Sequence, residues 1–374
     1  MDKKILGIGL GTAIIIAIFA VSLGVSTETE GPITVQNTNE KIGLVINSPN
    51  LPTTLQELDQ VYSEAADTGI GRSNVYLFWN LVEPERGEFD WRQSDALMSF
   101  NKKNNLKVTL YFSIINGETL GPFPDWIGKP SINSIGEDRV VSVLDEILSR
   151  YDIVDTVILA GQTESQFRFY EQNIPVYKEL FNGVYEEIKE KHPDVEIGNS
   201  FTLHQVLNKD LQHIVTELAI GDFVAFSYSP VDTVNEIVKT PLQAKDDLNQ
   251  IFDLVDDKKV GIFEISWSTS DFVFGSNSDQ SEFVQKSFEF YSENESQIEF
   301  FTWYRQYDRL DGTCIVEAPE IGQDTISVGG SGFGSSEHVI ERLSNYICHA
   351  GLVNNDGSPK SSWNEFKKQI EMLN

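Results

Sequence analysis

Val-Gly-Ile-Phe-Glu-Ile-Ser-Trp, residues 260–267, is the stretch of this sequence that decides the fold. It begins as a short apolar run, which is typical of a β-strand buried on both faces. Glu264 stands at the carboxyl end of that run, and Trp267 follows three residues later. An unpaired buried charge is costly, so a buried strand does not end in an acid without a reason. At the carboxyl end of a barrel strand, such an acid indicates catalysis. A glutamate that merely begins the next loop is the alternative.

Around this stretch, short apolar segments alternate with amphipathic ones from Lys41 to the end of the chain. The apolar segments predict strands at Lys41–Ile46, Asn74–Trp79, Lys107–Ser113, Thr156–Gly161, Glu196–Phe201, Phe223–Tyr228, Val260–Ile265 and Ile298–Trp303. The amphipathic segments predict helices at Leu55–Thr68, Gln93–Asn104, Asp138–Arg150, Val176–Lys191, Leu207–Ile220, Leu242–Val255, Ser281–Asn294 and Ser362–Leu373. Such alternation predicts an α/β fold with a parallel sheet. Eight strand–helix units over about 330 residues predict a (β/α)8 TIM barrel.

A doubly wound open sheet is the competing α/β fold. It would need a glycine-rich phosphate loop directly after an early strand. Gly69-Ile70-Gly71 instead precedes its predicted strand, and the glycine-rich run at 329–334 carries no lysine. The barrel is therefore the expected fold, and the second run is interpreted as part of a long loop after the last strand.

The amino-terminal segment predicts a membrane anchor. Lys3 and Lys4 precede 21 residues without a charge, Ile5–Val25, and about 20 apolar residues suffice to cross a bilayer as a helix. The run is longer than the apolar core of an ordinary signal peptide, and no clean cleavage pattern follows it. We therefore expect an uncleaved, single-pass anchor with the amino terminus inside and the barrel outside the cell membrane; a cleaved signal, and hence secretion, is the alternative. The expected organisation is a basic cytoplasmic end at 1–4, a transmembrane or signal-anchor helix at 5–25, a tether at 26–40 and the barrel at 41–374.

The net charge of −29 limits the classes of partner. A surface this acidic repels phosphate backbones, which excludes nucleic acid as a partner. It also disfavours anionic polysaccharides unless a local basic patch compensates.

Two cysteines, Cys314 and Cys348, occur without a zinc-binding pattern. In an oxidising exterior they can form one disulfide that pins the loop after the last strand. Two free buried thiols are the alternative.

Indole, phenol, amide and acid side chains follow the predicted strands, whose carboxyl ends meet at one rim of a barrel. They are Trp79, Trp126, Gln162, Glu164, His204, Tyr228, Glu264, Trp267 and Trp303. Two carboxylates across a barrel mouth suit cleavage of a glycosidic bond, because one protonates the leaving oxygen and the other attacks the anomeric carbon or activates a water. Aromatic faces and polar groups suit the two faces of a sugar ring. The rim therefore predicts carbohydrate as the partner, with no metal and no organic cofactor.

Four segments carry a resemblance to the clan A glycoside hydrolases, which are retaining β-glycosidases on a (β/α)8 barrel. They are Val75–Trp79 with Glu83–Trp91, then Phe263–Trp267, Phe300–Tyr304 and Gly351–Lys360. Their order and spacing are similar to the clan's pattern from Lys41 to the carboxyl terminus. The resemblance implies that Glu264 is the nucleophile.

The chain departs from the clan at the end of the fourth strand. The clan has Asn-Glu there, whereas this sequence reads Gly161-Gln162-Thr163-Glu164. Aligned without a gap, Thr163 replaces the acid, and a hydroxyl cannot act as a general acid near neutral pH. Either a one-residue bulge brings Glu164 inward as the acid/base, or the usual acid is missing.

These observations lead to one preferred function and two alternatives. The preferred function is hydrolysis of a neutral β-linked glycan outside the cell membrane, with Glu264 as nucleophile and Glu164 as acid/base. In it, Trp267 and Trp303 form a sugar platform, and Tyr228 either orients Glu264 or caps its strand. Trp79, Trp126, Gln162 and His204 complete the predicted substrate contacts, with core or loop roles as their alternatives. The rival functions are a degenerate barrel that binds carbohydrate without cleaving it, and an anchored scaffold with no sugar role.

Overall fold

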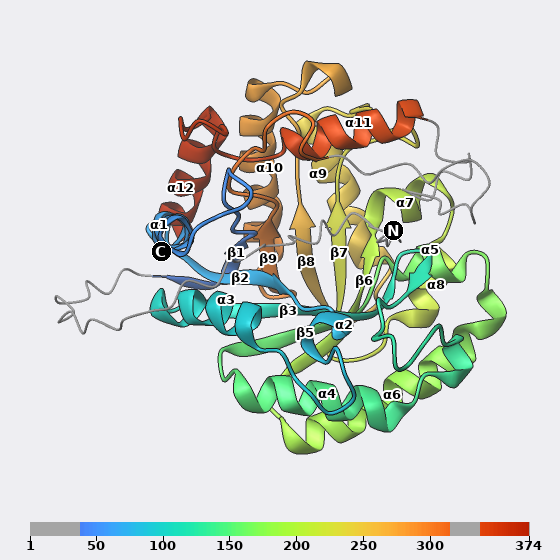
Figure 1. Ribbon diagram of the computed structural model, residues 1–374. Helices are drawn as coiled ribbons and strands as arrows, with labels where there is room; N and C mark the ends of the chain where they lie inside the picture. The colour runs from blue at the N-terminus through green and yellow to red at the C-terminus, as the bar shows by residue number, and fades with distance from the viewer. Residues whose placement is uncertain (1–37, 315–336, 374) are drawn as a thin grey trace.

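The computed structural model describes residues 38–314 and 337–373, and it is a closed (β/α)8 barrel (Figure 1). The parallel strands are β1 (Asn39–Leu44), β2 (Ile70–Tyr76), β3 (Lys107–Asn116), β5 (Val154–Gly161), β6 (Glu196–Thr202), β7 (Phe223–Tyr228), β8 (Lys259–Ile265) and β9 (Ile298–Trp303). Their order is β2-β1-β9-β8-β7-β6-β5-β3, and pairing of β2 with β3 closes the ring. A short strand, β4 (Thr119–Leu120), pairs antiparallel with the end of β3. Closure confirms the predicted barrel and excludes the open sheet.

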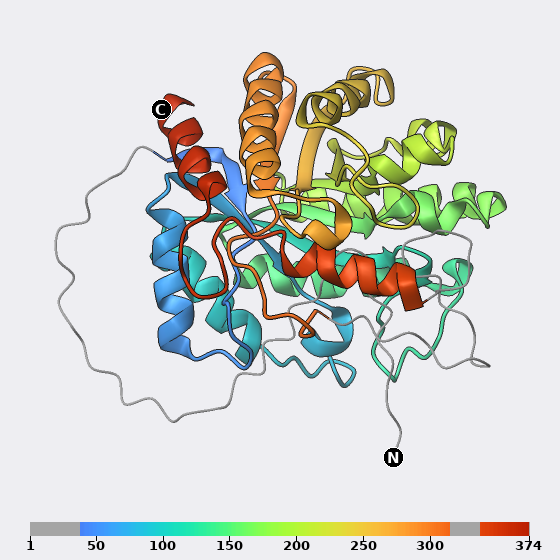
Figure 2. The same ribbon diagram turned by 90° about the horizontal axis from the view of Figure 1, so that it is seen from above.

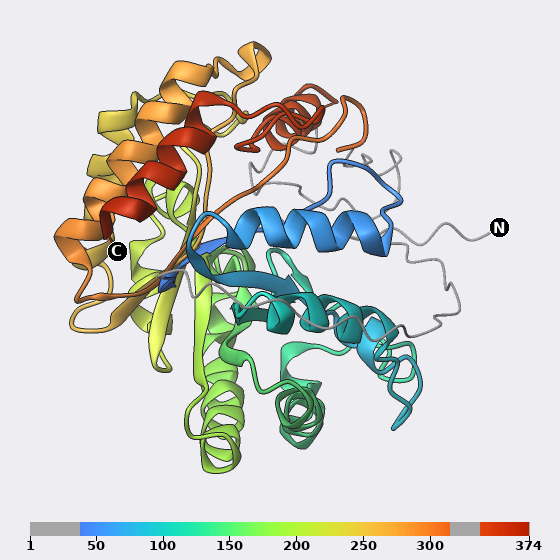
Figure 3. The same ribbon diagram turned by 90° about the vertical axis from the view of Figure 1, so that its left-hand side faces the viewer.

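Helices of 7 to 18 residues surround the barrel and cover the outer faces of its strands. They are α1 (Leu55–Ala66), α3 (Arg92–Lys103), α4 (Glu137–Arg150), α6 (Ile174–Lys191), α8 (Gln212–Leu218), α9 (Pro241–Asn249), α10 (Asn277–Asn294) and α12 (Ser361–Leu373). Helices α10 and α12 lie side by side on one flank (Figure 3). Short helices α2 (Trp79–Val82), α5 (Thr163–Phe167) and α7 (Leu203–Asn208) follow β2, β5 and β6. One further helix, α11 (Glu337–Cys348), crosses the mouth side of the barrel (Figure 2).

Local sequence signals fix where several helices begin. The hydroxyl of Thr54 accepts the backbone N–H of Glu57 at the start of α1. Thr240 and Gln243 form a reciprocal capping box at the start of α9, and Ser276 caps α10. Each such cap satisfies backbone donors that the first turn of a helix leaves without a partner, and contributes about 1 kcal/mol.

The amino end of the barrel is closed by a buried arginine. Arg72 pairs with Asp155 at 3.2 Å and donates to the hydroxyls of Thr109 at 2.9 Å and Thr156 at 3.3 Å. Above it lies an interior layer of mostly aromatic side chains: Phe78, Tyr111, Ile158, Phe223, Ala225, Phe263 and Phe300. This filling leaves the carboxyl ends of the strands as the place for a polar site, as in other barrels of this kind.

The second strand lies earlier in the chain than the sequence suggested. The ladder between β2 and β3 runs from Arg72 opposite Lys107 to Tyr76 opposite Tyr111. The predicted strand, 74–79, is therefore shifted, and Trp79 begins α2 instead of ending a strand. Polar residues obscured the true strand, because Arg72, Ser73 and Asn74 are buried with hydrogen-bond partners on other strands and on α3.

The cysteine prediction is confirmed, whereas the membrane anchor lies outside the described residues. Cys314 and Cys348 form a disulfide with their Cα atoms 5.6 Å apart. The bond joins the segment after β9 to the end of α11. The predicted anchor at 5–25 and most of the tether at 26–40 are not among residues 38–314 and 337–373. Within the described ranges, no helix has both the length and the apolarity that crossing a membrane requires.

Candidate active site

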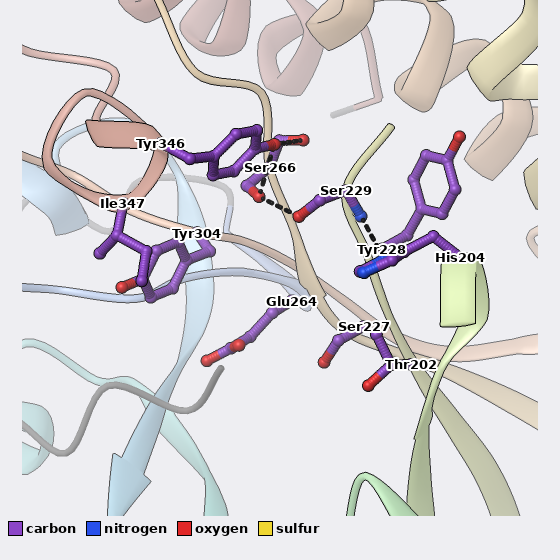
Figure 4. A pocket seen from close by; sticks show the side chains of 10 residues that line it. All are labelled: Thr202, His204, Ser227, Tyr228, Ser229, Glu264, Ser266, Tyr304, Tyr346 and Ile347. Carbon is purple, nitrogen blue, oxygen red and sulfur yellow. Dashed lines mark hydrogen bonds between the residues drawn. The ribbon is translucent and has the colours of Figure 1, made fainter. Parts of the chain in front are cut away.

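Glu264 is the next-to-last residue of β8 and lies in a pocket at the mouth of the barrel (Figure 4). The pocket is lined by Thr202, His204, Ser227, Tyr228, Ser229, Glu264, Ser266, Tyr304, Tyr346 and Ile347. The phenol of Tyr76, at the end of β2, donates a hydrogen bond to Oε1 of Glu264 from across the barrel. Burial raises the pKa of the Glu264 carboxyl to about 8, while the Tyr76 hydrogen bond and the charge of Arg305 lower it. The site therefore holds a buried carboxyl group with two groups that favour its ionised form.

Glu164 lies in the first turn of α5, and its side chain is completely buried. Its Oε2 accepts the backbone N–H of Thr202 at 3.1 Å, and its Oε1 accepts the hydroxyl of Ser165 at 3.1 Å. Burial raises the pKa of Glu164 to about 7, although these hydrogen bonds lower it. A carboxyl group with a pKa near 7 can both give and take a proton at neutral pH.

The turn before α5 fixes the position of Thr163. Gln162 has a left-handed backbone with φ of 51°, and Thr163 follows it as the first residue of the helix. The Thr163 hydroxyl donates to the carbonyl of Ser200 on the neighbouring strand at 2.9 Å. Thr163 is thus bound to the wall of the barrel, and the next residue carries the acid.

Tyr111 connects the two carboxyl groups electrostatically. Its ring lies in the barrel interior, 5.6 Å from the rings of both Phe263 and Tyr76. Burial raises the pKa of the Tyr111 phenol, and the charges of Glu264 and Glu164 raise it further. Both carboxyl groups therefore lie within electrostatic reach of one interior side chain.

His204 presents an unpaired donor. Its Nδ1 accepts the backbone N–H of Ser229 at 3.4 Å (Figure 4). Burial lowers the pKa of this imidazole to about 3, and the charges of Lys209 and Lys239 lower it further. The neutral ring therefore carries its proton on Nε2, which is buried and has no hydrogen-bond partner among the described residues. The predicted substrate contact through His204 stays a prediction, and this donor supports it.

Tyr228 does not orient Glu264. Its hydroxyl donates to Asp247 of α9 at 2.7 Å, and the tyrosine that does contact Glu264 is Tyr76. Of the two roles weighed for Tyr228, the orienting one is wrong. The phenol of Tyr76 was missed, although it lies inside a segment that carries the clan resemblance.

The predicted sugar platform is also wrong. Trp267 and Trp303 are 1% and 0% exposed. Both pack on Phe283 of α10, with ring centroids 5.1 and 5.8 Å away. The two indoles therefore belong to the core between the barrel and α10, where they offer no face to a ligand.

Trp79 and Trp126 hold the loop after β2. The indole of Trp79 is buried and donates to Glu83 Oε2 at 2.8 Å, and that of Trp126 donates to the carbonyl of Glu83 at 3.2 Å. Trp79 is thus packed in the core, and its predicted contact with substrate stays a prediction. Trp126 and Gln162 are only partly buried, so their roles stay predictions.

Helix α11 covers the pocket. The hydroxyl of Tyr346 donates to the carbonyl of Ser266 at 3.0 Å, and Asn235 donates to the carbonyl of Val339 at 3.2 Å. Beneath the helix, the free space beside Glu264 is about 10 Å³, which is about what one water molecule needs. A sugar ring therefore requires α11 or its side chains to move.

No group of acidic, histidine or cysteine side chains within 38–314 and 337–373 has the arrangement of a metal site. The chemistry available at the mouth is that of two carboxyl groups, phenols, a neutral imidazole and hydroxyls.

The fold is similar to that of the glycoside hydrolase barrels of families 5, 10 and 39. Among solved structures, a family 39 glycoside hydrolase from Bacteroides cellulosilyticus superposes with a TM-score of 0.59 at 16% identity over 90% of this chain; this chain covers 64% of its length. The GH5_18 protein of Bifidobacterium longum, solved as a variant in complex with Manβ1-4GlcNAc, gives 0.65 at 11% identity, covering 89% and 78% of the two chains. A psychrophilic family 10 endo-β-1,4-xylanase gives 0.57 at 13%, covering 87% and 96%. No family model and no curated protein matches the sequence.

Proposed function

We propose that the protein is a retaining glycoside hydrolase that acts on a neutral β-linked glycan outside the cell membrane. The observation that carries the proposal is the pair of buried carboxyl groups at the ends of β5 and β8: Glu264 lines the pocket at the mouth, and Glu164 accepts the backbone N–H of Thr202, which lines the same pocket. Their pKa values of about 7 and about 8 lie in the range where a carboxyl group can exchange protons at neutral pH. The Manβ1-4GlcNAc bound by the GH5_18 protein supports a sugar ligand for a barrel of this shape.

In the proposed reaction, Glu264 attacks the anomeric carbon as a carboxylate while the bond to the leaving oxygen breaks. Glu164 donates its proton to that oxygen, so the leaving sugar departs as a neutral alcohol. Glu164 then takes a proton from a water that attacks the same carbon, and Glu264 is released as a carboxylate. The sum is one water added across one glycosidic bond.

The pKa values impose a condition on this mechanism. Glu264 must be ionised and Glu164 protonated, yet Glu264 has the higher pKa. Tyr76 and Arg305 both favour ionised Glu264, and they are therefore positioning residues of the proposed nucleophile.

Activity assays with three variants test the proposal. The substrates are aryl β-glycosides and β-1,4-linked disaccharides of glucose, mannose and N-acetylglucosamine. We expect Glu264→Gln to abolish hydrolysis of every substrate that the unaltered protein cleaves, because the covalent step is lost. Glu164→Gln should slow the disaccharides far more than the aryl glycosides, whose leaving groups need little protonation. Glu187→Gln, on the exposed face of α6, is the control and should change neither.

A second candidate is a barrel that binds carbohydrate without cleaving it. The departure at Gly161–Glu164 favours it, because Thr163 stands where the resemblance places the acid and its hydroxyl is bonded to the carbonyl of Ser200. An unaltered protein that binds one of these sugars and hydrolyses none would establish this candidate and reject the first.

The location outside the membrane has its own support and its own test. A disulfide forms and persists in oxidising surroundings, and the protein has one between Cys314 and Cys348. We expect the full chain to sediment with membranes and a chain beginning near Asn39 to be soluble and folded. Recovery from the native source of a mature protein that lacks residues 5–25 would reject the anchor in favour of a cleaved signal.

A further inference from the structure

Beside Glu164, on the side of the mouth formed by β5 and β6, several buried polar atoms have no partner among the described residues. They are Oε1 of Gln166, Oε1 of Gln205 and Nζ of Lys209. Gln166 is 7% exposed and belongs to α5, and Gln205 is 6% exposed and belongs to α7. Figure 1 shows α5 and α7 at the same side of the barrel, beyond the ends of β5 and β6. Buried polar atoms are nearly always hydrogen-bonded, so a group of this kind indicates missing partners.

Helix α7 ties Lys209 to the proposed acid, because Glu164 accepts the backbone N–H of Thr202 at the N-cap of α7, and Lys209 is the C-cap of the same helix. Burial lowers the pKa of the Lys209 ammonium to about 8, as does the charge of Arg168, whereas the charges of Glu164 and Glu118 raise it. Arg168 forms an ion pair with Glu118, so these two largely neutralise each other. The charge that lowers the pKa of Glu264 is that of Arg305. Lys209 thus belongs to the Glu164 side of the site.

The chemistry of the unpartnered atoms suits sugar hydroxyls. The ammonium of Lys209 supplies donors, and the two amide oxygens supply acceptors. A hydroxyl group both donates and accepts, so neighbouring hydroxyls of one pyranose ring can satisfy all three. When Glu164 is protonated it no longer offers Lys209 a charge, which leaves the ammonium in most need of oxygen ligands in the state that the reaction begins from.

The position of these groups on the Glu164 side of the site indicates which of the two sugars of a substrate they contact. A general acid in this mechanism lies against the glycosidic oxygen, which joins the sugar attacked by the nucleophile to the sugar that leaves. Groups beyond the acid, away from the nucleophile, therefore face the leaving sugar. Resting on the proposed function, we propose that Gln166, Gln205 and Lys209 form a subsite that binds the hydroxyls of the leaving sugar.

Binding measurements on an inactive protein test this subsite. In the Glu264→Gln background, calorimetric titration compares cellobiose, β-1,4-mannobiose and N,N′-diacetylchitobiose with the methyl β-glycosides of the same sugars. A methyl glycoside fills the nucleophile side but has no leaving sugar. We expect Lys209→Met to weaken binding of the preferred disaccharide about 10-fold, which is about 1.4 kcal/mol, and to change the matching methyl glycoside less than twofold.

Two controls separate a subsite from a structural role. Lys102→Met, on the exposed face of α3, should change neither affinity. Lys209→Met should not lower the melting temperature, because removing a buried ammonium without a partner is neutral or stabilising. Equal weakening of disaccharide and methyl glycoside, or no weakening, would overturn the subsite and leave the proposed function standing. Failure of the parent protein to bind any of these sugars would overturn both.

Discussion

Replacing Tyr76 with phenylalanine removes the hydroxyl that donates to Glu264 and leaves the ring in place. A hydrogen bond to a charged group contributes about 1.5–3 kcal/mol, which corresponds to roughly 1–2 pKa units at 1.36 kcal/mol each. The pKa of Glu264, about 8 in the intact site, should therefore rise towards roughly 9–10. At pH 7.5 the ionised fraction then falls about 10- to 80-fold, and kcat/KM of the proposed hydrolase should fall with it.

An aryl β-glycoside with a good leaving group is the substrate for this assay, because its cleavage depends little on Glu164. We expect the ratio of kcat/KM between the two proteins to be largest at neutral pH and below, and to approach one at alkaline pH, where Glu264 is ionised in both proteins. Tyr185→Phe is the matched control, since its hydroxyl also donates to a carboxylate, Asp222, at 2.8 Å but on the outer helix α6. A loss that is the same at every pH would refute the reasoning and assign Tyr76 a role in packing alone.

Three further predictions concern stability. The pKa of Glu264 in the folded protein lies above its usual value of 4.5. The stability that the protonated group contributes is therefore complete below about pH 4.5 and is lost as the pH rises to about 8. In chemical unfolding, the free energy of unfolding of Glu264→Gln should rise relative to that of the parent between pH 5 and pH 8. Phe283→Ala should lower the free energy of unfolding by about 3–5 kcal/mol, since the ring packs against two buried indoles, and a loss below about 1 kcal/mol would mean that the core closes around the gap. Replacing Cys314 and Cys348 with serine should cost about 3–4 kcal/mol for a loop of 34 residues, and calorimetry with and without a reductant should show the parent, but not the variant, losing that amount.

The barrel could be predicted because its units repeat. Strand β8 is apolar on both faces, and each apolar segment is followed by an amphipathic one of helical length. The second strand was predicted too far along the chain, because strands with two buried faces usually consist of apolar residues. Ser73 is buried in that strand and donates to Asn101 of α3 at 2.6 Å, and such pairing depends on neighbours far along the chain.

The site was predicted less completely, for reasons of geometry. Glu264 could be found from its place at the end of a buried strand, but its contact with Tyr76 joins residues 188 positions apart and exists only because the barrel closes. The indole of Trp303 could have been placed outside by strand alternation. Phe300 faces the interior layer, so the residue three positions on faces the helices. For Trp267 no such alternation applies, because it lies beyond the end of β8.

Arg305 contacts helix α11, which covers the pocket, and also acts on Glu264, the proposed nucleophile. Its guanidinium donates to the carbonyl of Ile347 in α11 at 2.7 Å, and its charge favours ionised Glu264. A ligand that displaces α11 removes one partner of that guanidinium and alters the burial of Glu264, so it changes the affinity of Glu264 for its proton. By reciprocity, the ionisation of Glu264 changes how firmly α11 is held. Displacement of α11 and ionisation of Glu264 are thus thermodynamically linked, and the affinity for any ligand that displaces α11 should vary with pH.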